Sequence, residues 1–251
     1  MSERFEIVKE LEIAASPQEV WDAITTGTAG WLWPMEYEPK EGGAAPFGGT
    51  VTVWEPPHRL TARTEDVAGI SQQTLNQLEH VIEPLEGGGC RLRYVHSGIF
   101  VDDWANQYDG ADKHNDFYLH TLREYVTHFT GRQAVFATAD GPAAAGAPDA
   151  LDTAARALGL APGATVGETV TVTLPGASAP AAAVLDYRNP YFIGLRTQDA
   201  MYRVFGRNRF GATVGLSIHD FAPGAEHGAG SEAVSAALTR DAESWLAAVY
   251  G

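Results

Sequence analysis

The sequence has very little cysteine, with Cys90 as the single thiol in 251 residues. One thiol cannot close an intramolecular disulfide. The composition therefore excludes a disulfide-stabilised secreted domain and favours a reducing cytoplasm, with Cys90 as a small buried residue. No apolar run approaches the roughly 20 residues that a membrane-spanning helix needs. Because residues 1–6 also lack a signal-peptide pattern, we expect a cytoplasmic protein.

Positive charge is also scarce, because 17 lysines and arginines stand against 32 aspartates and glutamates and give a formal net charge of −15. Such an acidic surface repels nucleic-acid phosphates and anionic lipid headgroups, so neither nucleic acid nor a membrane is expected as a partner. Phosphate-binding glycine loops, nucleophile elbows and metal-binding cysteine pairs are missing. His120, Glu124 and His128 share one helix face at metal-ligand spacing. They lie beside the apolar stripe and are interpreted as solvated, so no metal and no cofactor are predicted.

The first half of the chain is rich in strand signals. Residues 4–13 alternate between apolar and polar side chains, as a half-buried strand does. Ser16 followed by Pro17, with Glu19 one turn later, predicts the capped start of a helix. Further apolar or alternating segments predict strands at residues 50–54, 60–64, 74–85 and 90–96. The three glycines at 87–89 between the last two segments favour an antiparallel hairpin.

From Asp102 onward the apolar period lengthens to between three and four residues, which predicts a helix of about seven turns. The predicted apolar face of this helix consists of Trp104, Tyr108, Ala111, Asn115, Leu119, Leu122, Val126 and Phe129. Asp102 and Asp103 suit the positive N-terminal end of a helix, and Gly131 can cap its C-terminal end.

A Pro- and Gly-rich stretch at residues 139–149 is the best candidate for a domain boundary. It predicts a first domain at 1–138, a linker at 139–149 and a second, α+β domain at 150–251. Periodicity in the second domain predicts a helix at 149–158, followed by strands at 166–174, 181–187, 191–196 and 209–221. A Gly- and His-rich loop at 223–230 then leads to a final helix at 231–250. This order suggests a reduced copy of the first domain without its first strand, or a distinct α+β domain.

Four segments of the first half carry a resemblance to a known family. They are Ser16–Ile24, the aromatic residues Trp31 and Trp33, Trp54–Leu60, and the stretch from Glu86 through Cys90 to Phe100 that leads into the long helix. In this order they resemble homologues of the activator of the heat-shock protein 90 ATPase, within the SRPBCC or START-related superfamily. Family members often have threonine where this chain has Cys90, and residues 140–251 lie outside the resemblance.

The resemblance implies a helix-grip fold for about residues 1–132. In this α+β architecture a curved antiparallel sheet wraps around one long C-terminal helix. Many members of the superfamily hold a hydrophobic small molecule between sheet and helix, some are polyketide cyclases or dehydratases, and some bind protein partners. The fold alone therefore does not select a function.

Two histidines, His80 and His96, are the most informative polar residues. If the hairpin is centred near Gly87, both side chains point to the concave face of the sheet, with Tyr94 between them. Imidazole and phenol groups in an apolar cavity can orient a ligand carbonyl or move a proton near neutral pH. The remaining candidate ligand contacts are Trp104, Tyr108 and Asn115 on the helix, and Trp31 and Trp33 at the cavity mouth. All of these residue types also occur in ordinary packed cores.

The leading hypothesis is a cytoplasmic binding protein that holds an apolar or aromatic small molecule between the sheet and the long helix. An enzymatic alternative is a polyketide cyclase- or dehydratase-like activity, in which His80, Tyr94 and His96 act as acid and base. A third alternative is a chaperone-associated protein-interaction module. A protein partner or a homodimer therefore stays open beside the hydrophobic ligand.

Overall fold

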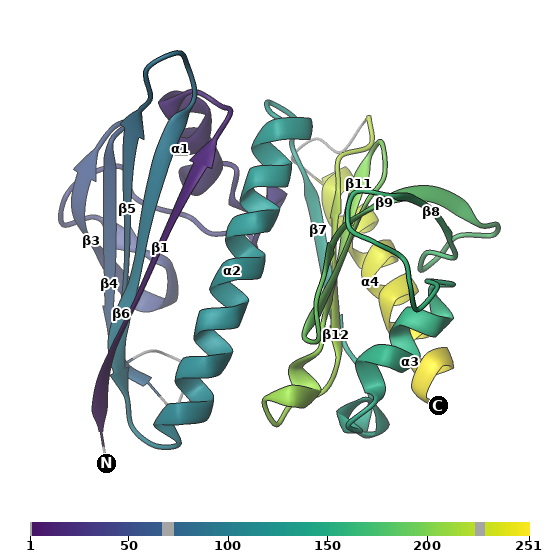
Figure 1. The fold of residues 1–251 in the computed structure, drawn as a ribbon. Helices are drawn as coiled ribbons and strands as arrows, with labels where there is room; N and C mark the ends of the chain where they lie inside the picture. The colour runs from purple at the N-terminus through teal and green to yellow at the C-terminus, as the bar shows by residue number, and fades with distance from the viewer. Residues whose placement is uncertain (1, 67–72, 224–228) are drawn as a thin grey trace. The chain divides into compact units, whose positions relative to one another are not determined.

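The chain divides into two compact units, Met1–Gly131 and Arg132–Gly251, in the computed structural model (Figure 1). The structure describes residues 2–66, 73–223 and 229–251. Most of the Gly- and His-rich loop predicted at 223–230 lies outside these ranges. No helix within them is both long enough and apolar enough to cross a membrane.

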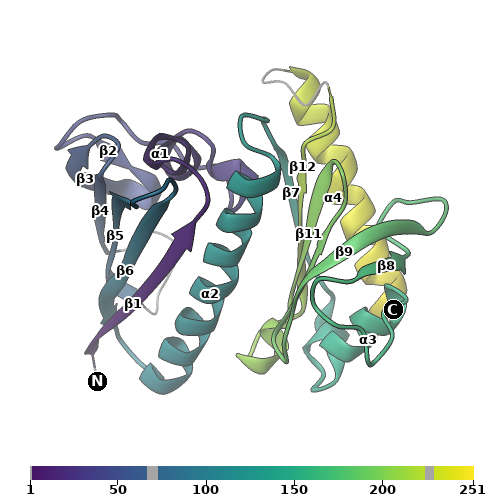
Figure 2. The same cartoon turned by 45° about the horizontal axis from the view of Figure 1, so that its top comes forward.

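The first unit is an antiparallel sheet with a long helix across one face. Its elements in chain order are β1 (Glu3–Ile13), α1 (Pro17–Thr25), η1 (Thr28–Gly30), β2 (Ala44–Ala45), η2 (Pro46–Gly48), β3 (Gly49–Glu55), β4 (Arg59–Glu65), β5 (Gln73–Pro84), β6 (Cys90–Phe100) and α2 (Trp104–His128). The strand order in the sheet is β1-β6-β5-β4-β3-β2. Figures 1 and 2 both show α2 lying along the face around which the sheet curves. This is the predicted helix-grip fold.

The start of α1 is fixed by the predicted capping box. The backbone N–H of Glu19 donates to Ser16 Oγ at 3.2 Å, and the backbone N–H of Ser16 donates to Glu19 Oε2 at 2.7 Å. Hydrogen bonds from the Ser16 backbone and hydroxyl lower the pKa of the Glu19 carboxyl. The helix that follows buries Val20, Trp21 and Ile24, as its apolar side predicts.

The β5–β6 hairpin has the predicted register. Pro84 pairs with Cys90 across the turn, and Gly87, Gly88 and Gly89 have φ angles of 91°, 102° and 80°. Only glycine adopts such angles without strain, so the three glycines determine where the strand reverses. Cys90 is fully buried, as expected, and burial raises the pKa of its thiol to about 11.

The two faces of the first sheet differ in character. The outer face carries charged side chains such as Arg59 and Arg93, which lie 2.7 and 3.4 Å from Glu79. The inner face is mostly apolar, and its cation Lys9 bonds to Asp112 and Asp116 of α2, both at 2.7 Å. These two ion pairs link β1 to α2.

The second unit has the same strand order as the first. Its elements are β7 (Val135–Asp140), η3 (Ala143–Gly146), α3 (Ala150–Ala157), β8 (Thr169–Val172), β9 (Ala181–Arg188), β10 (Phe192–Arg196), β11 (Ala200–Phe205), η4 (Arg207–Arg209), β12 (Gly215–Asp220) and α4 (Ala229–Tyr250). The sheet order is β7-β12-β11-β10-β9-β8, so in each sheet the first strand lies beside the last. The expectation of a copy without its first strand was wrong, because β7 supplies that strand.

The predicted linker at 139–149 differs from what the structure shows there. Residues 139 and 140 complete β7, and η3 follows. The small residues of this stretch are needed for close packing: a Cβ atom at Gly141 would lie 2.5 Å from Ala145 Cβ, and Ala145 is fully buried. The stretch therefore belongs to the second unit, which begins at Arg132.

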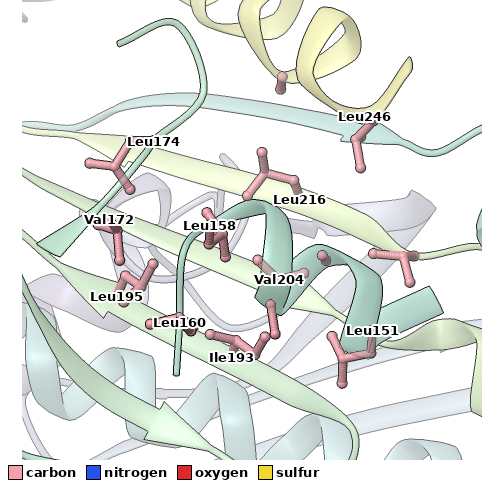
Figure 3. Packing of buried hydrophobic residues seen from close by; sticks show 14 of the residues in the cluster. Leu151, Leu158, Leu160, Val172, Leu174, Ile193, Leu195, Val204, Leu216 and Leu246 are labelled. Atoms are coloured by element: carbon pink, nitrogen blue, oxygen red, sulfur yellow. The ribbon is translucent and has the colours of Figure 1, made fainter. Parts of the chain in front are cut away.

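The core of the second unit fills the space between its sheet and its helices. Figure 3 shows Leu158 beside α3 and Leu246 of α4 on the same face of the sheet as Val204 and Leu216. Leu158, Val204, Leu216 and Leu246 are almost inaccessible to solvent. The inner face of this sheet is therefore a packed apolar core.

Candidate functional site

The hairpin register places three polar side chains on the inner face of the first sheet. His80 lies directly opposite Tyr94, and His96 lies opposite Leu78 on the next pair. His80 and His96 are thus diagonal neighbours on either side of Tyr94. The rings of His80 and Tyr94 have their centroids 5.1 Å apart. The predicted spatial grouping of these residues is present in the structure.

A chain of hydrogen bonds connects these strands to α2. Tyr94 Oη donates to Asn115 Oδ1 at 3.4 Å, and Asn115 Nδ2 lies 3.1 Å from His96 Nδ1. His96 Nε2 lies 2.7 Å from Asn76 Oδ1. Both polar groups of Asn115 and both nitrogens of His96 therefore have partners, so this part of the inner face is satisfied and fixed in orientation.

A small cavity lies between the sheet and α2. It is lined by Ile24, Trp31, Leu32, Met35, Tyr37, Leu78, His80, Tyr94, Asn115, Tyr118 and Leu119. The space open to the centre of a water molecule is about 20 Å³, which is room for one group of that size. The lining is mainly apolar, and its hydrogen-bonding groups come from both the sheet and α2.

His80 is the exceptional residue of this cavity. Its side chain is only 4% exposed, and neither ring nitrogen has a hydrogen-bond partner among the described residues. Buried polar groups without partners cost stability and are rare in folded proteins. Burial also lowers the pKa of His80 to about 4, because the imidazolium form cannot be solvated. The ring is therefore neutral at pH 7.

The other titratable groups of the site are neutral as well. Burial lowers the pKa of His96 to about 4 and raises the pKa of Tyr37 to about 12. The pKa of Tyr94 is also raised, first by burial and then by the nearby phenols of Tyr37 and Tyr118. The lining includes no Asp, Glu, Lys or Arg side chain among the described residues. Near neutral pH the cavity is therefore polar at one end but uncharged.

The helix residues Trp104 and Tyr108 are not among the lining residues of this cavity. Their rings stack on each other with centroids 4.8 Å apart, and both pack against Phe5 and Phe100. Trp104 Nε1 donates to the backbone oxygen of Arg4 at 3.2 Å. The structure thus places these two candidate contacts in a separate aromatic cluster on the same inner face.

The aromatic segment after α1 contributes one of its two tryptophans to the cavity. Trp31 is a lining residue, and its Nε1 donates to the backbone oxygen of Ala23 at 2.9 Å. Trp33 is outside the lining and contacts Phe47 and Tyr118 with ring centroids 6.1 and 5.8 Å away. Trp31 therefore lines the cavity, whereas Trp33 packs against the lining residue Tyr118.

Several lining residues were not among the candidate ligand contacts, and Met35 and Tyr118 show why. Met35 lies in irregular chain, where its backbone N–H donates to Thr28 Oγ1 at 2.8 Å, and no periodicity marks such a position. Tyr118 comes one helical turn after Asn115 and lies outside the predicted apolar stripe. The spacing from Asn115 is the one signal that places Tyr118 on the same side of α2.

Among the described residues, no group of three or more His, Cys, Asp or Glu side chains is placed to hold a metal ion. His128 and Glu124 approach within 3.6 Å as a surface pair. The pocket of the first unit is built from the β5–β6 hairpin and the middle of α2.

Comparison with protein families agrees with the motifs found in the sequence. Residues 14–127 match the model of the family described as "Activator of Hsp90 ATPase homolog 1-like protein". The first unit is a domain of this family. The match covers α1 to nearly the end of α2 and leaves the second unit outside. No curated protein matches the chain.

Several solved structures are similar to the chain at low sequence identity. Protein MLL2253 from Mesorhizobium loti is 21% identical over 50% of this chain and 98% of its own, with a TM-score of 0.42. The Aha1 dimer from Colwellia psychrerythraea is 16% identical over 49% of this chain and 96% of its own, with a TM-score of 0.37. DynU16, from the dynemicin biosynthetic locus, is 15% identical over 97% of this chain and 96% of its own, with a TM-score of 0.40. Because these values are low, the assignment rests on the family model.

Proposed function

We propose that the first unit binds a small, uncharged, largely apolar or aromatic molecule in the cavity between β5, β6 and α2. The observation that supports this most directly is His80, which is buried at the cavity without a protein partner for either nitrogen. A core that only needed to be filled would be more stable with an apolar side chain at this position. A ligand that bonds to His80 would offset the cost of burying it. A cytoplasmic location belongs to the same proposal.

The electrostatics of the lining favour an uncharged ligand. A carboxylate or phosphate would lose its hydration on entering the cavity, and no described lining side chain offers a compensating positive charge. A cation would meet the same cost, because the lining also lacks carboxylates. The apolar residues Ile24, Leu78 and Leu119 instead suit a hydrocarbon or aromatic body.

The size of the cavity adds a condition to the proposal. A space of about 20 Å³ holds one water-sized group, so a larger ligand must displace lining side chains. Leu32, Met35 and Tyr37 lie between η1 and β2, where the chain has no helix or strand. Met35 is unbranched and adapts its shape readily. We expect this segment to move outward when a ligand enters.

The acid–base alternative receives less support from the same residues. A general acid or base works best when its pKa lies near the working pH. Burial instead lowers the pKa of His80 and His96 to about 4 and raises that of Tyr94. These shifts favour hydrogen bonding to a ligand over proton transfer at pH 7.

The test is a titration of the full chain with 4-methylphenol, followed by tryptophan fluorescence and by two-dimensional NMR. We expect saturable binding with shifts centred on β5, β6 and α2. Leu78→Phe fills the cavity and should weaken binding at least tenfold, whereas Leu75→Phe on the same strand changes a residue outside the lining. Absence of saturable binding, or equal binding by both variants, would contradict the proposed function.

A further inference from the structure

Hydrogen bonds connect Asn76, His96, Asn115 and Tyr94 in series. Which atoms can donate determines where the hydrogen atoms of this series lie. An amide nitrogen only donates, so Asn115 Nδ2 donates to His96 Nδ1 at 3.1 Å. The neutral His96 ring must then carry its hydrogen on Nε2, which donates to Asn76 Oδ1 at 2.7 Å. Each bond in the chain thus has one direction that satisfies both of its partners.

The same logic determines what Tyr94 offers to the cavity. Asn115 Oδ1 only accepts, so the Tyr94 hydroxyl donates its one hydrogen to it across 3.4 Å. Tyr94 Oη is left with a lone pair, and Tyr94 lines the cavity. Toward a ligand, Tyr94 is therefore a hydrogen-bond acceptor.

His80 offers the complementary group beside it. A neutral imidazole has one N–H donor and one bare nitrogen acceptor, and both are without a partner among the described residues. The His80 ring lies next to Tyr94, with centroids 5.1 Å apart. One end of the cavity thus presents an N–H donor and a phenol oxygen acceptor to the same small space.

We propose that the ligand carries a hydroxyl group that accepts a hydrogen bond from His80 and donates one to Tyr94 Oη, as a phenol does. This inference rests on the proposed binding function and specifies the ligand class. A hydroxyl is the size of a water molecule, and the cavity of about 20 Å³ has room for one group of that size. A ketone or ether accepts but cannot donate, so it leaves the Tyr94 acceptor unpaired. A carboxylate adds a charge that the lining does not balance.

The experiment compares phenol, benzaldehyde and toluene by NMR titration of the full chain. All three probes contain one benzene ring. The hydroxyl of phenol donates and accepts hydrogen bonds, the aldehyde of benzaldehyde only accepts them, and the methyl group of toluene does neither. Phenol should bind at least tenfold more tightly than the other two, since one net hydrogen bond is worth about a factor of ten. Hydrophobicity alone predicts the reverse order of affinities, because toluene leaves water more readily than phenol does.

Variants assign the preference to particular atoms. Tyr94→Phe and His80→Leu should each remove most of the preference for phenol while keeping toluene binding. Tyr108→Phe, which removes a hydroxyl from the separate aromatic cluster, should leave the preference unchanged. Nitrogen NMR of the side chains should find the His96 hydrogen on Nε2, and a hydrogen on Nδ1 would overturn the assigned polarity.

The outcomes separate the two proposals. Equal binding of phenol and toluene by the unmodified chain would overturn the hydroxyl inference and leave the proposed binding function standing. Binding of benzaldehyde as tightly as phenol would overturn the acceptor role of Tyr94. If none of the three probes binds, both proposals fail.

Discussion

Replacing His80 with leucine should make the first unit more stable. Leucine has a similar volume, and the substitution removes two buried nitrogens that have no partner among the described residues. Leaving a buried polar group unpaired costs roughly 1–3 kcal/mol. Some of this gain is lost with the ring contact to Tyr94, whose centroid lies 5.1 Å away. We expect the free energy of unfolding at pH 7 to rise by about 1–2 kcal/mol.

The pH dependence of stability gives a second readout for the same variant. Burial lowers the pKa of His80 from 6.5 to about 4 in the folded protein. The unfolded chain therefore takes up a proton below pH 6.5 that the folded protein refuses, and stability is lost as the pH falls from 6.5 toward 4. At 1.36 kcal/mol per pKa unit this loss amounts to about 3 kcal/mol, and His80→Leu should abolish it.

Tryptophan fluorescence is a suitable probe, because five of the six tryptophans lie in the first unit. They are Trp21, Trp31, Trp33, Trp54 and Trp104. Urea unfolding at pH 7 and at pH 5 would give the free energies, provided that the slope with urea is the same for each variant.

His96→Leu is the matched control, since both nitrogens of His96 have partners. Its removal leaves Asn76 and Asn115 without those bonds, so this variant should lose stability by roughly 1–3 kcal/mol. The reasoning is refuted if both leucine variants lose stability to a similar extent, or if His80→Leu keeps the acid sensitivity of the unmodified chain.

Two further predictions concern single contacts outside the cavity. Ser16→Ala should lower the unfolding free energy of the first unit by about 1 kcal/mol in the same urea assay. This difference should shrink at acid pH, because the lowered pKa of Glu19 means that its bonds to Ser16 are lost as the carboxylate protonates. Arg203→Leu should destabilise the second unit by roughly 3–5 kcal/mol, because it leaves Asp186, 2.7 Å from Arg203 Nη1, as a buried charge. Hydrogen exchange of the β11 amides measures this loss of stability. Adding Asp186→Leu to Arg203→Leu should restore much of the lost stability. Equal instability of the single and double variants would contradict the ion-pair argument.

Much of the first unit could be predicted because its signals are local. The capping box at Ser16 and Glu19 involves neighbours in sequence, and the glycines at 87–89 determine the register of the hairpin. Once that register is known, alternation places His80, Tyr94 and His96 on one face. The long helix is equally clear from its period, and the structure places it at Trp104–His128.

The second unit was harder to predict because its strands do not alternate. In β11 the buried residues run almost without interruption on both faces of the sheet, so the period of two disappears. Arg203 in the middle of this strand is a charged residue, which indicates exposure in a sequence, yet it is 1% exposed. In β7, small residues that pack closely were interpreted as the start of a flexible linker.

The helix stripe also shows why a shared face does not define a shared site. Trp104, Tyr108 and Asn115 all lie on the inner face of α2, as predicted. An α-helix rises about 1.5 Å per residue, so Trp104 and Asn115 are separated by about 16 Å along the axis. Trp104 therefore packs with Phe5 and Phe100, while Asn115 reaches the cavity. Periodicity gives the direction of a side chain but not its neighbours on the sheet.

The repeated strand order allows the two inner faces to be compared position by position. In each sheet the last two strands form an antiparallel pair, β5 with β6 and β11 with β12. The inner cross-strand pair that lines the cavity in the first sheet is His80 with Tyr94. In the second sheet Val204 pairs with Leu216, both buried in the apolar core. Two sheets of the same strand order thus carry, on corresponding strand pairs, a polar pair beside a cavity in one unit and a buried apolar pair in the other. The same strand order in the second unit surrounds an apolar pair, so the strand order itself does not require His80 and Tyr94, and the proposed ligand would give these polar groups a partner.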